Sequence, residues 1–250
     1  MRRKAKNQFI GYFEGRSLFS RQDLYDYYVD TEGEVKEGTL GWRIYDLKQK
    51  NILREVRKGW YTVDVHPFYN PVLDSTLKEL AKLFIKNFRD SRCCIWKLSW
   101  LNEFTVHQFS SERIIFEIEK DLQESFANLL GDNGYNNVVW DVKGSLPRNN
   151  FKEIPIVLLP LISRAPVQDI TTDDGQSVVV PTLEKILVDI YEGKSIFRFL
   201  QGAEVERIFE HAIKRYAINY ATLFNYAKRR GKVAELNALL SKYVPDTLIK

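Results

Sequence analysis

Three amphipathic patterns of helical period fill the first fifty residues, and they constrain the fold more than any other feature of the chain. The first pattern covers residues 5–14 and ends at Gly15. The second begins with Ser20, an N-cap residue that can form a capping box with Asp23 three positions later. The third covers residues 36–49. Within each pattern, apolar residues recur at the spacing of one buried helix face: Phe9, Ile10 and Phe13; Leu24, Tyr27 and Tyr28; Leu40, Ile44 and Leu47.

Two short β-prone segments follow the third pattern and flank a basic turn, residues 57–59, that ends in glycine. Glycine at such a turn permits the positive φ that a tight hairpin needs. Three helices followed by a hairpin with a basic tip have the element order of a winged helix-turn-helix. We therefore predict this domain over residues 1–66, and we expect Trp42 and Trp60 to belong to its core, with an outward Trp42 on the third helix as the alternative.

An extended connection with two prolines, residues 67–71, predicts a boundary, so a second domain is expected over residues 67–250. The succession of strand, helix and strand over residues 113–142 indicates a parallel pair with a crossover helix. After residue 180 the patterns are helical to the end. The predicted fold class is α+β (mixed α/β), in which the N-terminal winged helix-turn-helix precedes an α/β domain with a C-terminal helical part. The predicted strands cover 92–100, 113–118, 137–142 and 154–159, and the predicted helices cover 75–88, 120–130, 180–190, 203–216, 219–230 and 233–243.

Polar side chains on the third helix and on the hairpin tip are the candidate DNA-binding residues. If Leu40, Ile44 and Leu47 face the core, the third helix turns its polar side chains outward, where a recognition helix meets base edges in the major groove. Arg43 is the first choice for a base contact. The complete predicted set is Lys36, Thr39 and Arg43 on the helix and Arg57 and Lys58 on the wing. The alternative interpretation is a winged helix used for protein contacts.

The charge distribution agrees with nucleic-acid binding without proving it. The chain carries a net charge of +4, and residues 1–66 hold 13 Lys or Arg against 10 Asp or Glu. No apolar run is long enough for a membrane span, and the basic start lacks the apolar stretch of a secretory signal, so we expect a cytoplasmic protein. The basic run at residues 228–232 is expected to be a solvated helix cap, with a second nucleic-acid contact as the alternative.

The residue types that bind metals are sparse. The cysteines, Cys93 and Cys94, are adjacent in an extended segment, where neighbouring side chains point to opposite faces and cannot chelate one ion well. The histidines, His66, His107 and His211, lie far apart without partners at ligand spacing. We therefore predict reduced structural thiols, no metal and no cofactor.

One loose catalytic template is present. A Mg²⁺-dependent nuclease of the restriction-endonuclease type needs two acids and a lysine, and Glu119, Asp141 and Lys143 fit that spacing. Acid-x-Lys triplets are common in a chain with 28% charged residues, so the template has low specificity. Because the sequence contains no phosphate-binding loop, dinucleotide fingerprint or nucleophile elbow, we predict a protein that is not an enzyme.

Two parts of the sequence resemble AbiEi-like antitoxins, the regulators of type IV toxin-antitoxin systems. The first part is Thr39-Leu40-Gly41-Trp42-Arg43-Ile44-Tyr45, which leads through Asn51-Ile52-Leu53 to Arg57-Lys58-Gly59-Trp60-Tyr61. The second is the helical pattern Pro181-Thr182-Leu183-Glu184-Lys185-Ile186-Leu187-Val188-Asp189. The likeness covers the first sixty-odd residues and the C-terminal helical part, and it is thin between Asp64 and Val180.

This resemblance implies a transcriptional regulator that binds double-stranded operator DNA and represses its own operon. It also implies that the C-terminal domain counteracts a toxin of nucleotidyltransferase type. The polar positions on the third helix and the wing match the DNA-binding surface of that family. A stand-alone regulator, the nuclease described above and a module for protein contacts remain the alternatives.

Overall fold

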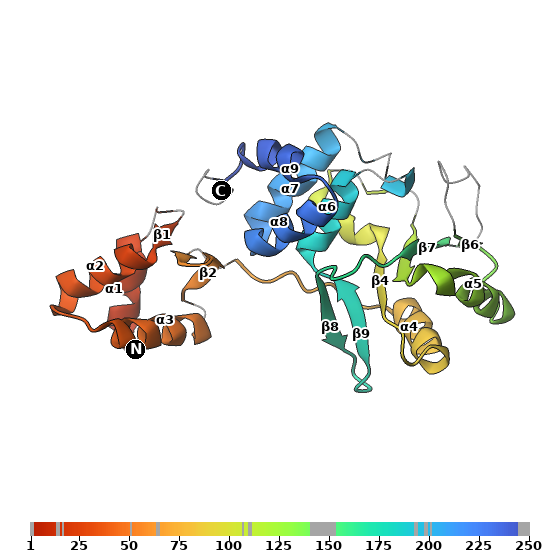
Figure 1. Ribbon diagram of the computed structural model, residues 1–250, viewed down its shortest axis with the longest axis horizontal. Helices are drawn as coiled ribbons and strands as arrows, with labels where there is room; N and C mark the ends of the chain where they lie inside the picture. The colour runs from red at the N-terminus through yellow and green to blue at the C-terminus, as the bar shows by residue number, and fades with distance from the viewer. Residues whose placement is uncertain are drawn as a thin grey trace.

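The computed structural model describes residues 3–13, 16, 18–50, 52–63, 66–106, 108–109, 112–140, 154–192, 195–197, 200 and 202–244. Within them the chain is a mixed α+β protein (Figure 1). Residues 3–63, called the N-terminal module, lie at one end of the molecule, and an extended segment leads from them to the larger remainder.

The N-terminal module combines helices with short strands. It comprises α1 (Arg3–Phe13), β1 (Phe19–Ser20), α2 (Arg21–Glu32), α3 (Glu37–Gln49), β2 (Arg54–Arg57) and β3 (Trp60–Thr62). The three strands form an antiparallel sheet in the order β1-β3-β2. Lys58 and Gly59 form the turn of the hairpin. Gly59 has a φ of +77°, so the predicted need for a positive φ at this turn is confirmed.

The sequence pattern explains how these helices start and pack. The side chain of Ser20 accepts a hydrogen bond from the backbone N–H of Asp23, and the Asp23 carboxylate accepts one from the Ser20 N–H, so the predicted capping box is confirmed. The apolar faces of α1, α2 and α3 meet in one core, in which Phe13 stacks on Phe19 at 3.9 Å between ring centroids. Trp42 corrects one prediction, because it is 66% exposed on α3 rather than buried.

A four-stranded sheet forms the centre of the larger part. Its order is β4-β5-β7-β6, with β4 antiparallel to β5, and with both β5 and β6 parallel to β7. The parallel crossover predicted for residues 113–142 is present, and β7 is inserted between its two strands. These strands are β4 (Cys93–Lys97), β5 (Ile114–Ile118), β6 (Val138–Val139) and β7 (Ile156–Pro160).

Both faces of this sheet are covered, so successive strand residues enter different cores. On β5, Ile114, Phe116 and Ile118 join the core beneath α4 (Ser75–Asn87) and α5 (Gln123–Asp132). Ile115 joins the opposite core, which the C-terminal helices complete. These helices are α6 (Leu183–Glu192), α7 (Ala203–Arg215), α8 (Tyr220–Arg229) and α9 (Val233–Leu240). Short 3-10 helices lie between other elements of the larger part: η1 (Leu98–Phe104), η2 (Lys120–Leu122) and η3 (Ser195–Phe197).

A second hairpin, β8 (Val167–Thr171) and β9 (Ser177–Pro181), was missed by the sequence analysis and projects from the molecule (Figure 1). The pattern from residue 180 was interpreted as helical, whereas α6 begins only at Leu183 because residues 178–180 belong to β9. Gly175, with a φ of +81°, lies in the tight turn of the hairpin. None of the helices in the described ranges combines the length and the apolar character required to cross a membrane.

The hairpin of the N-terminal module contacts the C-terminal helices. Val56 of β2 is buried in the core built by α6 to α9, not in the core of its own module. Tyr220, the first residue of α8, lies near Arg54 of β2. Burial raises the pKa of Tyr220, and the positive charge of Arg54 opposes part of this rise. The two parts therefore share an apolar contact in addition to their connection.

Candidate functional site

The outward face of α3 is the first candidate site. Leu40, Ile44 and Leu47 are buried, as the helical spacing predicted, so the opposite face points to solvent. Trp42 and Tyr45, at 66% and 61% exposure, form the most prominent part of that face. Lys36, the N-cap residue of α3, and Thr39 are also exposed, which leaves both predicted contacts accessible.

Arg43 lies on the flank of α3 that turns toward α2. Its guanidinium donates to Glu32 Oε2 at 2.7 Å and sits 4.4 Å from the centre of the Tyr28 ring. The side chain is 24% exposed. Arg43 therefore joins α3 to α2, and a base contact by this residue requires the guanidinium to leave Glu32. Burial raises the pKa of Tyr28 to about 12, so the ring remains a neutral phenol at physiological pH.

The hairpin tip lies next to the start of α2. The backbone N–H of Arg21 donates to the carbonyl of Gly59 at 2.9 Å. The Arg21 guanidinium donates from Nε and Nη2 to Glu37 Oε1 in the first turn of α3, at 2.9 and 2.5 Å. Lys58 is exposed at the tip, and Arg57 ends β2 with a side chain outside the described part of the structure. One end of α3 and the hairpin tip are thus linked through Arg21.

Carboxylates neutralise most cations around α3. Lys48 pairs with Glu55, and Lys50 pairs with Asp46, each at 2.6 Å. Together with the pairs of Arg43 and Arg21, these contacts cancel much of the positive charge of the helix. Within the described ranges, Lys36 and Lys58 are cations of this surface without an ion-pair partner.

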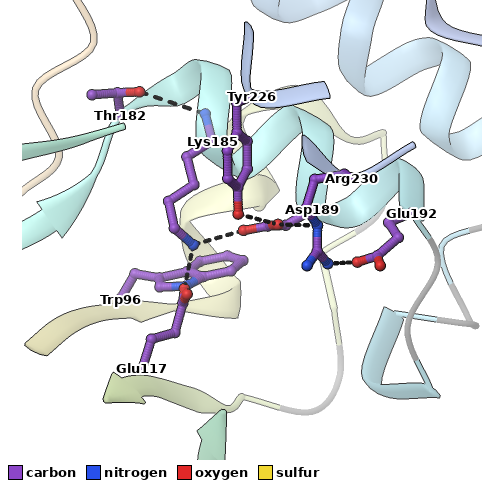
Figure 2. Close-up of polar contacts among 8 residues, drawn as sticks. All are labelled: Trp96, Glu117, Thr182, Lys185, Asp189, Glu192, Tyr226 and Arg230. Atoms are coloured by element: carbon purple, nitrogen blue, oxygen red, sulfur yellow. Dashed lines mark hydrogen bonds and ion pairs between the residues drawn. The ribbon is translucent and has the colours of Figure 1, made fainter. Parts of the chain in front are cut away.

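A buried ionic cluster in the larger part is the second candidate site (Figure 2). At its centre is Lys185 of α6, whose side chain has no exposure to solvent. Its Nζ donates to Glu117 Oε1 of β5 at 2.5 Å and to Asp189 Oδ2, one helical turn away, at 2.6 Å. Trp96 Nε1 donates to Glu117 at 3.2 Å, and the hydroxyl of Tyr226 on α8 donates to Asp189 at 2.9 Å.

Arg230 extends this cluster at the end of α8. Its side chain is 6% exposed, with Nε lying 3.6 Å from Asp189 Oδ1 and Nη2 pairing with Glu192 (Figure 2). Arg229 donates to the backbone carbonyls of residues 163 and 164 at 2.9 and 2.8 Å. The prediction that residues 228–232 form a solvated cap is therefore wrong for Arg230, which is drawn inward by two carboxylates.

The electrostatics of the cluster follow from its burial. Burial raises the pKa of Glu117, and the attraction of Lys185 offsets only part of that rise. For Lys185, burial alone would lower the pKa, but the carboxylates of Asp189 and Glu117 outweigh this effect and raise the pKa well above its usual value. The lysine ammonium occupies the space between the two carboxylates where a metal ion would have to lie. The cluster therefore connects β5, α6 and α8 through buried ion pairs and hydrogen bonds.

Among the described residues, the other candidate residues form neither a metal site nor a catalytic site. No group of three or more His, Cys, Asp or Glu residues there could hold a metal ion. Glu119 is exposed just after β5, whereas Asp141 and Lys143 lie outside the described residues, so the nuclease template remains a prediction. Cys93 and Cys94 are buried free thiols, and burial raises the pKa of Cys93 to about 12, which makes it a poor nucleophile.

A groove of about 710 Å³ lies between the hairpin and the start of α8. Lys58 and Val56 contribute to one wall, and Ile218 and Ala221 contribute to the other. Lys58 therefore borders both the outer surface of the hairpin and this groove.

Sequence reasoning missed the ionic cluster although a pattern for it was present. From Leu183 to Ile190 every residue of α6 is buried, so polar residues within this run have to find partners inside the protein. Lys185 and Asp189 are four residues apart in the run and therefore share a helix face. Their third partner, Glu117, is 68 residues away from Lys185 and carries no comparable pattern.

The comparisons with known proteins identify a family for this chain. The model of a family of unknown function (DUF6577) matches residues 39–246, a range that begins within α3 and includes the hairpin and nearly all of the larger part. No curated protein matches the chain. The family match links the chain neither to antitoxins nor to enzymes. Because the match covers most of its length, the chain belongs to the DUF6577 family, whose function is unknown.

Proposed function

We propose that the chain is a DNA-binding transcriptional regulator of the cytoplasm whose N-terminal module is a winged helix-turn-helix. The observation that carries this proposal is the order α1-β1-α2-α3-β2-β3 with the sheet order β1-β3-β2. In this arrangement α3 is the recognition helix and the β2–β3 hairpin is the wing.

The accessible cations support duplex DNA as the partner. Lys36 at the start of α3 and Lys58 at the wing tip have no ion-pair partner in the described chain, so neither needs to leave a carboxylate before it binds a phosphate. Thr39 is exposed between them in the sequence and can donate or accept a hydrogen bond at a base edge or phosphate. Arg57 is assigned to the wing contact from the sequence alone.

The antitoxin role is a narrower form of this proposal and rests on the sequence resemblance. It assigns the larger part to the neutralisation of a nucleotidyltransferase-like toxin encoded beside this chain. Co-expression with the neighbouring reading frame tests it: growth that the neighbour arrests and this chain restores supports the antitoxin role. A neighbour that has no effect on growth restricts the proposal to a stand-alone regulator.

The DNA-binding proposal is tested with the full chain and a library of random duplexes. We expect repeated selection to enrich one sequence, which a mobility-shift assay at low salt then binds tightly. Lys58→Ala should weaken binding to every duplex by a similar factor and reduce the slope of log K against log salt concentration by about one, because one phosphate contact is lost. Lys86→Ala, an exposed lysine of α4, is the matched control and should change neither quantity.

Two results contradict the proposal. The first is the absence of any enrichment and of any binding at low salt. The second is an equal loss for Lys58→Ala and Lys86→Ala, which would place the nonspecific contact elsewhere on the molecule.

A further inference from the structure

The outward ridge of α3 is aromatic where a charged or amide side chain is common in DNA recognition. Trp42 and Tyr45 are three residues apart and form one exposed ridge on the helix. Arg43, the charged neighbour of Trp42, is held against Glu32 and Tyr28 on the flank. The large side chains at the centre of the outward face of α3 are therefore aromatic.

Gly38 gives a second, independent indication of close approach at this ridge. It lies one turn before Trp42 in the helix, where glycine lowers helix stability relative to alanine. A Cβ built at Gly38 would meet no atom within 4 Å, so packing inside the chain does not require glycine there. Its φ does not require glycine either, because Gly38 is absent from the positive-φ positions. A partner that approaches the helix backbone closely would explain the residue.

Exposed cations at the start of α3 and at the hairpin tip indicate what the partner is. Lys36 lies near the start of α3 and Lys58 at the wing tip, and both are exposed cations without a carboxylate partner in the described ranges. An apolar ridge on a helix that begins with an exposed lysine complements a major groove, whose floor carries thymine methyl groups and whose edges carry phosphates. A second copy of the chain would instead bring like charges together.

We propose that Trp42 reads thymine in the major groove by apolar contact with the C5-methyl group, and that Gly38 leaves the space for this approach. This inference rests on the proposed DNA binding and adds the base chemistry that α3 recognises. The duplex site of this protein therefore contains at least one thymine opposite Trp42.

Replacement of thymine by deoxyuridine tests the proposal directly, because it removes the methyl group and keeps every hydrogen-bonding group of the base. In the selected duplex, each thymine is replaced singly and the Kd of the full chain is measured. At the thymine opposite Trp42 we expect Kd to rise about fourfold, the value for one methyl group returned to water. Trp42→Ala should bind the thymine duplex more weakly and lose this difference, whereas the control Trp140→Ala should retain it.

Gly38→Ala separates a binding role from a structural role. In the free protein the substitution should raise Tm by about 1–4 °C, because alanine is the better helix former. The same variant should bind the selected duplex at least tenfold more weakly if the added methyl group meets the DNA. Gly11→Ala, at an open position of α1, should raise Tm by a similar amount without a change in Kd.

Several outcomes overturn the inference while DNA binding stands. They are a selected site without thymine, a Kd that no deoxyuridine replacement changes, a Trp42→Ala variant as sensitive to deoxyuridine as the unchanged protein, and a Gly38→Ala variant with unchanged Kd. A dimer that Trp42→Ala converts to a monomer without loss of DNA affinity would assign the ridge to self-association. Failure to bind any duplex would refute the proposed function itself.

Discussion

Trp42 and Arg43 are neighbours in the chain, but their side chains point in different directions from α3 and have different surroundings. The sequence favoured Arg43 as the outward side chain and Trp42 as a core residue, whereas Trp42 is exposed and Arg43 lies against Glu32 and Tyr28. The apolar spacing correctly predicted which residues of α3 face the core. It did not show that Trp42 lies at the centre of the opposite face and Arg43 at its flank. An arginine on the flank can reach a carboxylate of α2, whereas the aromatic ring at the centre of the outward face is mostly exposed to solvent.

At the residue scale, Arg43→Ala is expected to reduce the free energy of unfolding. The loss should be about 1 kcal/mol, because one cation–π contact and one partly exposed ion pair disappear. Urea unfolding of the full chain measures it, with Glu32→Gln as a comparison that removes only the ion pair and should cause a smaller loss. An unchanged unfolding midpoint would show that the contacts with Glu32 and Tyr28 do not stabilise the module.

At the element scale, polar side chains decide how helices start and how they attach to the sheet. The capping box at Ser20 satisfies two backbone N–H groups at the start of α2. In the larger part, Lys185 joins α6 to β5 through Glu117, and Asp189 joins α6 to α8 through Tyr226. These contacts orient α6 on a sheet whose apolar surface alone would allow it to slide.

The capping box predicts a local loss of stability. Ser20→Ala should lower the free energy of unfolding by about 1 kcal/mol, the usual contribution of an N-cap side chain. Hydrogen bonds from Ser20 keep the pKa of Asp23 below its ordinary value of 3.8, so the stabilisation by Asp23 is present above pH 3.8 and is lost as the pH falls through the lower folded-state value. Urea unfolding at pH 7 measures the loss, and Ser91→Ala, outside any capping box, is the control. Equal midpoints for the two variants would contradict the prediction.

The ionic cluster predicts a larger, pH-dependent loss. Lys185→Met should lower the free energy of unfolding by about 3–5 kcal/mol at pH 7, because Glu117 remains buried without a cation and Asp189 retains only the more distant Arg230. Burial already raises the pKa of Glu117 above its ordinary value of 4.5, and the loss of the lysine raises it further. The folded variant therefore retains a proton that the unfolded chain releases, and its deficit should shrink as the pH is lowered toward 4.5.

Urea unfolding of both proteins at several pH values checks this prediction, and Lys185→Met/Glu117→Gln provides the matched comparison. The double variant should recover part of the loss at pH 7 and show a weaker pH dependence. A deficit for Lys185→Met that is constant with pH would contradict the assignment of the loss to buried carboxylate charge.

At the scale of the whole molecule, the N-terminal module and the larger part are joined by an apolar contact. Val56 of β2 is buried with the C-terminal helices, and Tyr220 of α8 lies beside Arg54 of the same strand. A change in the position of α8 would therefore reach the β2–β3 hairpin directly. The groove between this hairpin and α8 lies at this junction.

Tyr220→Ala is expected to weaken the coupling between the two parts. Its ring is buried, so removal should cost several kcal/mol locally, about 3–5 for a fully buried aromatic side chain. We expect calorimetry to resolve one unfolding transition for the unchanged protein and two for the variant, because each part has its own core. A single transition at lower temperature in the variant would indicate that the parts remain one cooperative unit.

Residues that are close together in the chain predicted much of the local structure of this protein. Apolar spacing predicted the buried face of α3, Ser20 predicted the start of α2, and Gly59 predicted the hairpin turn. These features depend on residues within a few positions of one another, for which periodicity and backbone preference are sufficient. The short hairpin β8–β9 was missed because its valine-rich strand runs directly into α6.

Which charged side chains meet depends on how the helices and strands pack. Glu117 and Lys185 come together because β5 and α6 face each other across one core, and Arg230 enters the same cluster from the end of α8. The same is true of Arg43, which the packing of α3 on α2 brings to Glu32. Coulomb attraction depends on distance in space, and residues far apart in the chain acquire that distance only when the helices and strands pack.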